Sequence, residues 1–300
     1  MVITRLVPKG QSLPTRDPEA APLACGMCTG RGFSQLARFT APPQGETRFG
    51  FADYARTLWR CDCCGHVVNR HGLDLEALYV GQYRDATYGD RLKSIYDRIM
   101  ALPEGRSDNR GRVRRIEAWC QSQSLPCPGR LLDVGAGLGV FPAAMAERGW
   151  QVVALDPDPV ACDHLRDVVE VETWCGSFDP RDNFTAPKAQ RFDLITFNKV
   201  LEHIVPMVET LARAHRFLAP GGQVYVELPD GEGALADAGP DREEFFVEHH
   251  CAFSLPSFSL LARRAGYRIE MLERVREPSG KFTLRGFLSP DITPDLLNDA

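Results

Sequence analysis

Three alternating glycines and two acids form the pattern in this chain that is best suited to chemistry. An apolar run ends at Asp133, and Gly135, Gly137 and Gly139 lead from it into a helix-compatible segment. Glycine tolerates a positive φ and lets a ligand approach the backbone closely. A second apolar run ends at Asp156, 21 residues after Gly135, where a carboxylate can accept hydrogen bonds from two ribose hydroxyls. The pattern predicts a site for a nucleotide-type cofactor, with a ligand-free tight turn as the alternative.

Four cysteines near the N-terminus form two Cys-x-x-Cys pairs. Cys25 and Cys28 make the first pair, and Cys61 and Cys64 make the second, 32 residues further on. Two such pairs supply the four thiolates that tetrahedral zinc favours, so we expect one structural zinc ion. Cys63 could replace a member of the second pair, but only Cys61 and Cys64 have the two-residue spacing. Metal-free thiols and a redox pair are the alternatives.

Length and composition limit the classes of protein. The chain has 300 residues and a formal net charge of −5, which gives no reason to expect a nucleic-acid partner. No run approaches the ~18 apolar residues of a membrane span. The apolar start is too short for a signal peptide, so a cytoplasmic protein is expected.

These landmarks divide the chain into five segments. They are an irregular leader (1–24), a zinc-binding module (25–72), a helical lid or linker (73–127), a doubly wound α/β domain (128–290) and a tail (291–300). In the α/β domain we expect strands up to Asp133 and at 151–156, 168–174, 192–197, 223–228, 267–274 and 281–287, with helices at 205–217 and 257–265. The last two strands form a predicted hairpin, so the sheet is parallel except at one end.

The ordered motifs resemble the class I S-adenosylmethionine-dependent methyltransferases. The resemblance is carried by the glycine motif, Asp156, and the segments 192–204 and 218–222, and it covers about residues 129–290. It implies a seven-stranded sheet with strand order 3-2-1-4-5-7-6, its seventh strand antiparallel. A dehydrogenase would use similar early strands but a Gly-x-Gly-x-x-Gly motif, so the spacing here favours the methyltransferase.

The resemblance also implies which residues bind S-adenosylmethionine. The glycine loop and the acid before it would pass under the methionine part, and the second acid would hold the ribose. Ser177 and Phe178 would lie beside the adenine, and Asn198 would lie near the methionine part or the substrate. The expected cofactor residues are therefore Asp133, Gly135, Gly137, Gly139, Asp156, Ser177, Phe178 and Asn198.

A proton acceptor must be sought outside the cofactor motif, because the sulfonium already makes the methyl group electrophilic. Glu248, His249 and His250 lie in a long polar segment after the fifth strand, where such folds place their ligands. We expect His249 to be the general base, with Glu248 orienting its ring. His250 is the second choice, and His203 is the next.

The four-cysteine module with a Glu-His step resembles zinc-containing sugar methyltransferases. Some of them methylate carbon, but Phe246 stands where they often have a tyrosine. The segment 88–113 is similar to methyltransferases of polysaccharide pathways, and we read it as a lid with Tyr83 and Tyr88 as cofactor contacts. The expected reaction is O-methylation of a small molecule or sugar in polysaccharide or secondary-metabolite biosynthesis. Carbon methylation, RNA methylation and a non-catalytic cofactor-binding scaffold are the alternatives.

Overall fold

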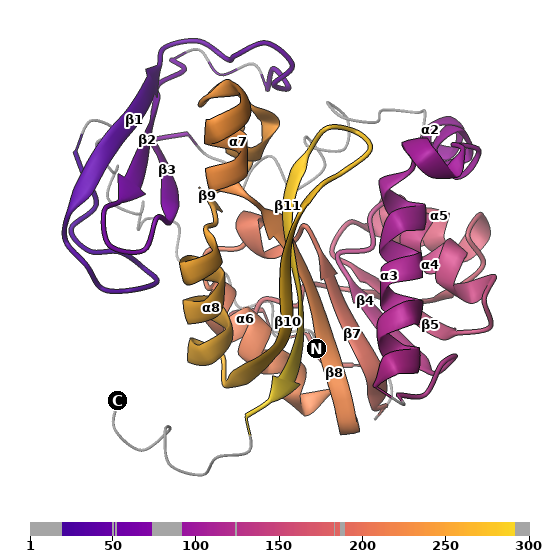
Figure 1. Cartoon of the computed structure of the whole chain (residues 1–300). Helices are drawn as coiled ribbons and strands as arrows, with labels where there is room; N and C mark the ends of the chain where they lie inside the picture. Colours follow the sequence, from indigo (N-terminus) through magenta and orange to yellow (C-terminus); the bar gives the residue numbers. More distant parts are fainter. Residues whose placement is uncertain are drawn as a thin grey trace, which may run out of the picture.

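A seven-stranded mixed sheet forms the centre of the molecule (Figure 1). The computed structural model describes residues 20–49, 51, 53–73, 92–123, 125–182, 184–186 and 190–291. The strands of this sheet are β4 (Arg130–Val134), β5 (Gln151–Asp156), β6 (Glu172–Cys175), β7 (Phe192–Asn198), β8 (Leu218–Pro229), β10 (Tyr267–Arg276) and β11 (Phe282–Pro290). They lie in the order β6-β5-β4-β7-β8-β11-β10, and β11 is antiparallel to both neighbours. The predicted strand order and fold class are confirmed.

Helices cover both faces of this sheet. Residues of α3 (Asp108–Ser122) and α4 (Val140–Ala146) pack on one face around Leu131 of β4. Residues of α6 (Met207–Arg213) and α8 (Leu255–Arg264) pack on the other face around Leu132. Since a parallel strand covered on both faces is apolar throughout, β4, β5 and β7 could be recognised as continuous apolar runs.

Three predicted elements differ most from the structure in their bounds. β6 begins at Glu172 rather than 168, because α5 (Pro159–Asp167) and its cap at Val168 occupy the preceding residues. β8 begins at Leu218 and therefore includes the Pro-Gly-Gly segment that we expected to precede it. Its pairing with β7 continues on both sides of this segment because the register shifts between Phe192 and Leu194. The helix expected over 205–217 is shorter: α6 starts after Pro206, and a 3-10 turn, η5 (Ala214–Arg216), follows it.

A second, four-stranded sheet lies beside the first and draws strands from both ends of the chain. Its order is β1 (Phe33–Phe39), β2 (Arg56–Cys61), β3 (Val67–His71) and β9 (Cys251–Ala252). Val67 pairs with Ala252 and Val68 with Cys251 in antiparallel register. β9 follows α7 (Gly231–Ala238) and η6 (Glu243–Phe245) in the chain. In Figure 1 the indigo N-terminal sheet therefore lies against the orange segment that carries β9.

The helical segment that follows β3 and precedes β4 in the sequence is described from residue 92 onward. It contains α2 (Leu92–Met100), a 3-10 turn, η3 (Glu104–Arg106), and α3. Tyr83 and Tyr88, the two expected lid contacts, lie outside the described residues. The five-segment division of the chain stays a prediction. Among the residues that the structure describes, no helix has both the length and the apolar character needed to cross a bilayer.

Candidate active site

The glycine-rich loop between β4 and α4 fits closely against its surroundings at two of its three glycines. φ is +71° at Gly135 and +73° at Gly139. A Cβ atom at Gly135 would lie 2.6 Å from a methyl carbon of Val200, and one at Gly139 would lie 2.7 Å from Leu165. At Gly137, with φ +52°, nothing lies within 4 Å of an added Cβ. The backbone at Gly137 is therefore open to the approach of a ligand.

Asp156 ends β5 beside this loop and fixes the loop's shape. One carboxylate oxygen accepts a hydrogen bond from the Gly137 amide at 2.8 Å, and the other accepts one from the Asp158 amide at 2.9 Å. Burial raises the pKa of Asp156 to about 6, against the opposing effect of these two bonds. Each carboxylate oxygen can accept a further hydrogen bond, so the side chain retains capacity for two hydroxyls.

Asp133 connects β4 to the neighbouring strand β7. Its Oδ1 accepts hydrogen bonds from Thr196 Oγ1 at 2.6 Å and from Asn198 Nδ2 at 2.8 Å. Burial raises the pKa of Asp133 to about 7. The amide oxygen of Asn198 is buried and makes no hydrogen bond to the described part of the chain. Asp133 thus fixes the orientation of Asn198 at the carboxyl end of β7.

The two residues expected beside an adenine lie just after β6. Ser177 is half-buried, and its Oγ accepts a hydrogen bond from the Asp179 amide at 3.0 Å. Phe178 is buried, with ring centroids 5.8 Å from Phe197 and 5.4 Å from Phe217. These contacts place Phe178 in the hydrophobic core, and its role beside adenine stays a prediction.

His249 and His203 come together at the carboxyl ends of β7 and β8. Their ring centroids are 4.8 Å apart, in an edge-on arrangement. Nδ1 of His249 lies 3.0 Å from the carbonyl oxygen of Glu244, and Nδ1 of His203 lies 2.9 Å from that of Glu248. A backbone carbonyl, rather than the Glu248 carboxylate that we expected, therefore orients the His249 ring. Burial, and then the neighbouring His203, holds the pKa of His249 well below its usual value.

His250 occupies a different environment from His249. Its backbone amide donates to the carbonyl oxygen of Glu202 at 2.8 Å, and its ring stacks on His71 of β3, with centroids 6.4 Å apart. Of the two adjacent histidines, His249 is the one grouped with Glu202 and His203. The preference for His249 over His250 as general base stays a prediction.

The segment around His249 is held by the N-terminal sheet. The side-chain amide of Asn69 donates to the carbonyl oxygen of His249 at 3.1 Å, and its backbone amide donates to that of His250 at 3.0 Å. A buried ion pair joins Arg56 to Glu46 at 3.0 Å. Arg56 also donates a hydrogen bond to the Phe245 carbonyl at 2.8 Å, and Glu46 accepts one from the backbone amide of Val247 at 2.9 Å. Removing one member would leave the other charge buried and unpaired, which costs about 3–5 kcal/mol.

Sequence reasoning did not select the charged residues that adjoin this cluster. Lys199 follows β7 with φ +59°, a backbone conformation that residues other than glycine rarely adopt. Its amide donates to the carbonyl of Glu227 at 3.1 Å. Burial favours the neutral form of Glu227, but its ion pair with Arg112 holds the pKa at about 2. The position of Lys199 directly after a buried strand was the signal that could have identified it.

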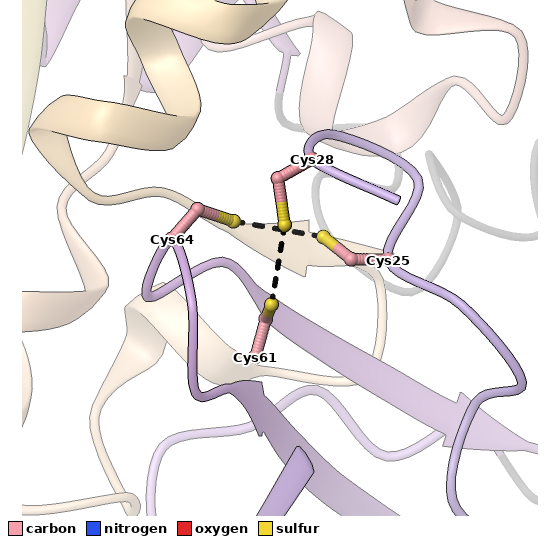
Figure 2. A group of neighbouring side chains, drawn as sticks. All are labelled: Cys25, Cys28, Cys61 and Cys64. Atoms are coloured by element: carbon pink, nitrogen blue, oxygen red, sulfur yellow. Dashed lines mark hydrogen bonds between the residues drawn. The ribbon is translucent and has the colours of Figure 1, made fainter. Parts of the chain in front are cut away.

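Four cysteines meet at the edge of the N-terminal sheet. Figure 2 shows the thiols of Cys25, Cys28, Cys61 and Cys64 pointing toward one another. Sγ–Sγ distances are 3.6 Å between Cys25 and Cys64 and 3.5 Å between Cys28 and Cys61. Tetrahedral zinc with Zn–S bonds of about 2.3 Å would set its sulfurs about 3.8 Å apart. Cys63 is exposed and does not belong to the cluster. The donor set and its spacing fit one zinc ion.

Backbone hydrogen bonds shape both cysteine turns. The amide of Met27 donates to Sγ of Cys25, and that of Gly30 donates to Sγ of Cys28, each at 3.4 Å. In the second turn the Gly65 amide donates to the carbonyl of Cys61 at 2.9 Å. Amide donors stabilise the charge of thiolate ligands, as outer-shell hydrogen bonds do at metal sites.

The strand order, the glycine loop at the end of β4 and the acid at the end of β5 define a class I S-adenosylmethionine-dependent methyltransferase. The family model described as "Methyltransferase domain" matches residues 106–272, more than half of the chain. The chain therefore belongs to this methyltransferase family.

Curated relatives agree with this assignment. The ubiquinone biosynthesis O-methyltransferase of Azotobacter vinelandii is 36% identical over 101 residues, which are 32% of this chain and 42% of the relative. The enzyme of the same name from Pseudomonas aeruginosa is 31% identical over 103 residues, 32% of this chain and 43% of the relative. The chain thus spans less than half the length of these relatives.

A solved structure supports the fold independently. The 1,6-didemethyltoxoflavin-N1-methyltransferase of Burkholderia thailandensis, with bound 1,6-didemethyltoxoflavin and S-adenosylhomocysteine, superposes with a TM-score of 0.51. The two chains are 21% identical, and the match covers 83% of this chain and 99% of the other. At this identity the similarity shows the fold and no more.

Proposed function

We propose that this enzyme transfers the methyl group of S-adenosylmethionine to a hydroxyl of a small-molecule or sugar acceptor, in polysaccharide or secondary-metabolite biosynthesis. The observation that carries the proposal is the half-buried His249, whose ring is held through Nδ1 by the Glu244 carbonyl and lies beside His203 at the carboxyl ends of β7 and β8. An oxygen acceptor is further supported by the curated relatives, which are named as O-methyltransferases.

His249 is suited to receive the acceptor's proton. A carbonyl oxygen only accepts hydrogen bonds, so Nδ1 of His249 carries the hydrogen in its contact with Glu244. Nε2 then carries the lone pair. The lowered pKa keeps the ring neutral near pH 7, as a proton acceptor must be. When bound, S-adenosylmethionine supplies an electrophilic methyl group, and the protein's part is to align the hydroxyl and take up its proton at Nε2.

The cofactor would bind at the loop after β4 and at the carboxyl ends of β5 and β7. Asp156 would accept from the ribose hydroxyls, Gly137 would lie against the methionine part, and Asn198, held by Asp133, would face the methionine part or the substrate. Ser177 would lie beside the adenine. The carboxylate that already holds the Gly137 amide would thus bind loop and ribose together.

We further propose that Cys25, Cys28, Cys61 and Cys64 hold one structural zinc ion. The thiolates would neutralise the ion in a closed four-ligand shell with no open position for a substrate. The support is the cluster geometry and its two amide-to-sulfur hydrogen bonds.

The reaction is tested by incubating the protein with labelled S-adenosylmethionine and panels of nucleotide sugars, glycans and phenols, followed by mass spectrometry. The expected product carries one methyl group on oxygen, located by fragmentation. Label found on carbon, nitrogen or RNA, or cofactor binding without turnover on any acceptor, would contradict the proposal.

Asp156→Ala should weaken binding of S-adenosylhomocysteine by one to three powers of ten. The variant loses charge-assisted hydrogen bonds worth about 1.5–3 kcal/mol each, and every 1.4 kcal/mol is about tenfold in affinity. Calorimetric titration measures the change, and circular dichroism checks that the fold is retained. Asp158→Ala is the matched control, because this neighbour contacts Asp156 through its backbone amide. Unchanged affinity in Asp156→Ala would remove the residue from the site.

Affinity for S-adenosylhomocysteine should fall as the pH is lowered through about 6. The Asp156 pKa is about 6 without ligand, and hydroxyl donors favour its charged form, so binding releases a proton below that pH. The affinity then drops by up to about tenfold per pH unit. Asp156 interacts electrostatically with Asp133 of β4 and with Asp158 of the same turn. Asp156→Asn should flatten the profile, and an unaltered profile would contradict the assignment.

A further inference from the structure

Glu202, His203 and His249 form a second group of potential metal ligands, separate from the four cysteines. One donor atom from each residue lies within 4.8 Å of the donor atoms of the other two. Glu202 and His203 belong to the 3-10 turn η4 (Leu201–His203) after β7, and His249 belongs to the segment before β9. Two distant parts of the chain are thus folded so that two imidazoles and a carboxylate converge.

The two histidines have the arrangement that metal-binding histidines adopt. Each ring places Nδ1 against a backbone carbonyl, at 2.9 Å for His203 and 3.0 Å for His249. Since the carbonyls can only accept, Nε2 is the nitrogen of each ring that carries a lone pair. Histidine ligands are commonly fixed in this way by a hydrogen bond from the nitrogen that does not bind the metal.

Glu202 lacks the partners that a buried carboxylate requires. Its side chain is fully buried, and neither carboxylate oxygen makes a hydrogen bond within the part of the chain that the structure describes. Burying an ionised group without a partner costs several kcal/mol. The positive charges of Lys199 and Lys281 act on Glu202 electrostatically, but neither makes a hydrogen bond to its carboxylate in the described part of the chain. Lys281 is also paired with Glu243 at 3.0 Å. A bound cation would supply the missing partner.

We propose that Glu202, His203 and His249 bind one divalent transition-metal cation on the acceptor side of the active site. Two imidazoles and one carboxylate suit Mn²⁺, Fe²⁺, Co²⁺ or Zn²⁺, and three protein ligands leave positions open for an exogenous oxygen. This inference rests on the proposed function in one respect, since the oxygen would be the acceptor's hydroxyl. A metal-bound hydroxyl loses its proton to water near neutral pH. The oxygen then bonds to the methyl carbon as the methyl–sulfur bond breaks, leaving a neutral thioether.

The cation would change the role of His249. Nε2 cannot bind a metal and take up a proton at once, so in the cation-bound enzyme His249 is a ligand and the acceptor's proton goes to solvent. Loss of activity in a His249 variant does not distinguish the two roles. Metal binding does, because a general base needs no cation.

The test is a titration with Mn²⁺ of protein that carries one zinc ion per chain, monitored by the electron paramagnetic resonance signal of the free Mn²⁺. Mn²⁺ favours oxygen and nitrogen ligands over thiolates, so the cysteine site does not compete. The expected result is one tightly bound Mn²⁺ per chain. Glu202→Gln, which keeps the side-chain shape, should lower Mn²⁺ affinity at least about 100-fold, beyond the usual effect of an outer-shell change.

Two further variants test whether Mn²⁺ binding depends on the cluster. His203→Ala should weaken Mn²⁺ binding as Glu202→Gln does, whereas His250→Ala, one residue from His249 but outside the cluster, should bind Mn²⁺ as the parent protein does. No bound Mn²⁺ in the parent protein, or equal binding in Glu202→Gln, would overturn the cation site. Neither result bears on whether oxygen is the methyl acceptor, which the product analysis decides by itself.

Discussion

His249→Ala is expected to reduce kcat by about 10²–10⁴-fold, the usual contribution of a positioned general base. The side chain lies at the carboxyl ends of β7 and β8 and contacts the Glu244 carbonyl through Nδ1. Its proposed position faces the acceptor, so affinity for S-adenosylhomocysteine should hardly change. Steady-state kinetics and calorimetry on the same preparations separate the two effects.

His250→Ala is the matched control for this substitution and should be milder. Its ring stacks on His71 of the N-terminal sheet instead of joining Glu202 and His203. If His250→Ala is the more damaging change, the acceptor lies on the other side of the segment. If neither variant loses activity, His203 becomes the first candidate to receive the proton.

Removing zinc with a strong chelator is expected to unfold the cysteine turns and abolish methyl transfer. Metal binding to four-thiolate peptides contributes about 10–16 kcal/mol to folding, more than a sheet of this size gains from its own core. Hydrogen exchange followed by mass spectrometry should show faster exchange at residues 25–72 and also at 245–254. The second region is affected because Ser254 donates a hydrogen bond to the Cys64 carbonyl and Asn69 holds His249.

Cys64→Ser and Cys63→Ser form the matched pair for this prediction. Cys64 is buried in the cluster, whereas Cys63 is exposed and outside it. Elemental analysis should find close to one zinc per chain in Cys63→Ser and a large loss in Cys64→Ser. A metal-free protein with unchanged exchange at residues 25–72 would refute the structural role of zinc.

The sequence was most informative where the chain is locally regular. The apolar runs that end at Asp133 and Asp156 predicted two buried parallel strands with acids at their carboxyl ends, and β4 and β5 have those ends. The terminal hairpin predicted that one end of the sheet is antiparallel, as β10 and β11 are. In these cases residue type and neighbouring residues determine the element.

Long-range pairing was the part that the sequence did not reveal. β9 has only two residues and no alternation that could mark it as a strand, so its pairing with β3 could not be foreseen. His203 and Glu248–His249 were each noted separately, but the meeting of His203 and His249 depends on how two loops fold at one edge of the sheet. The orientation of His249 was predicted from the adjacent Glu248, whereas the backbone carbonyl of Glu244 provides it.

The strand β9 has a consequence for protein engineering. A shortened chain that begins near residue 106 would keep every strand of the seven-stranded sheet, yet it would strip β9 of the backbone partners that Val67 and Val68 provide. The segment with His249 would then end in an unpaired edge, prone to pairing with other chains. Grafting the N-terminal sheet of a relative onto this chain therefore requires the relative's counterpart of residues 245–254 to be transferred with it, because β3 and β9 pair across these two segments.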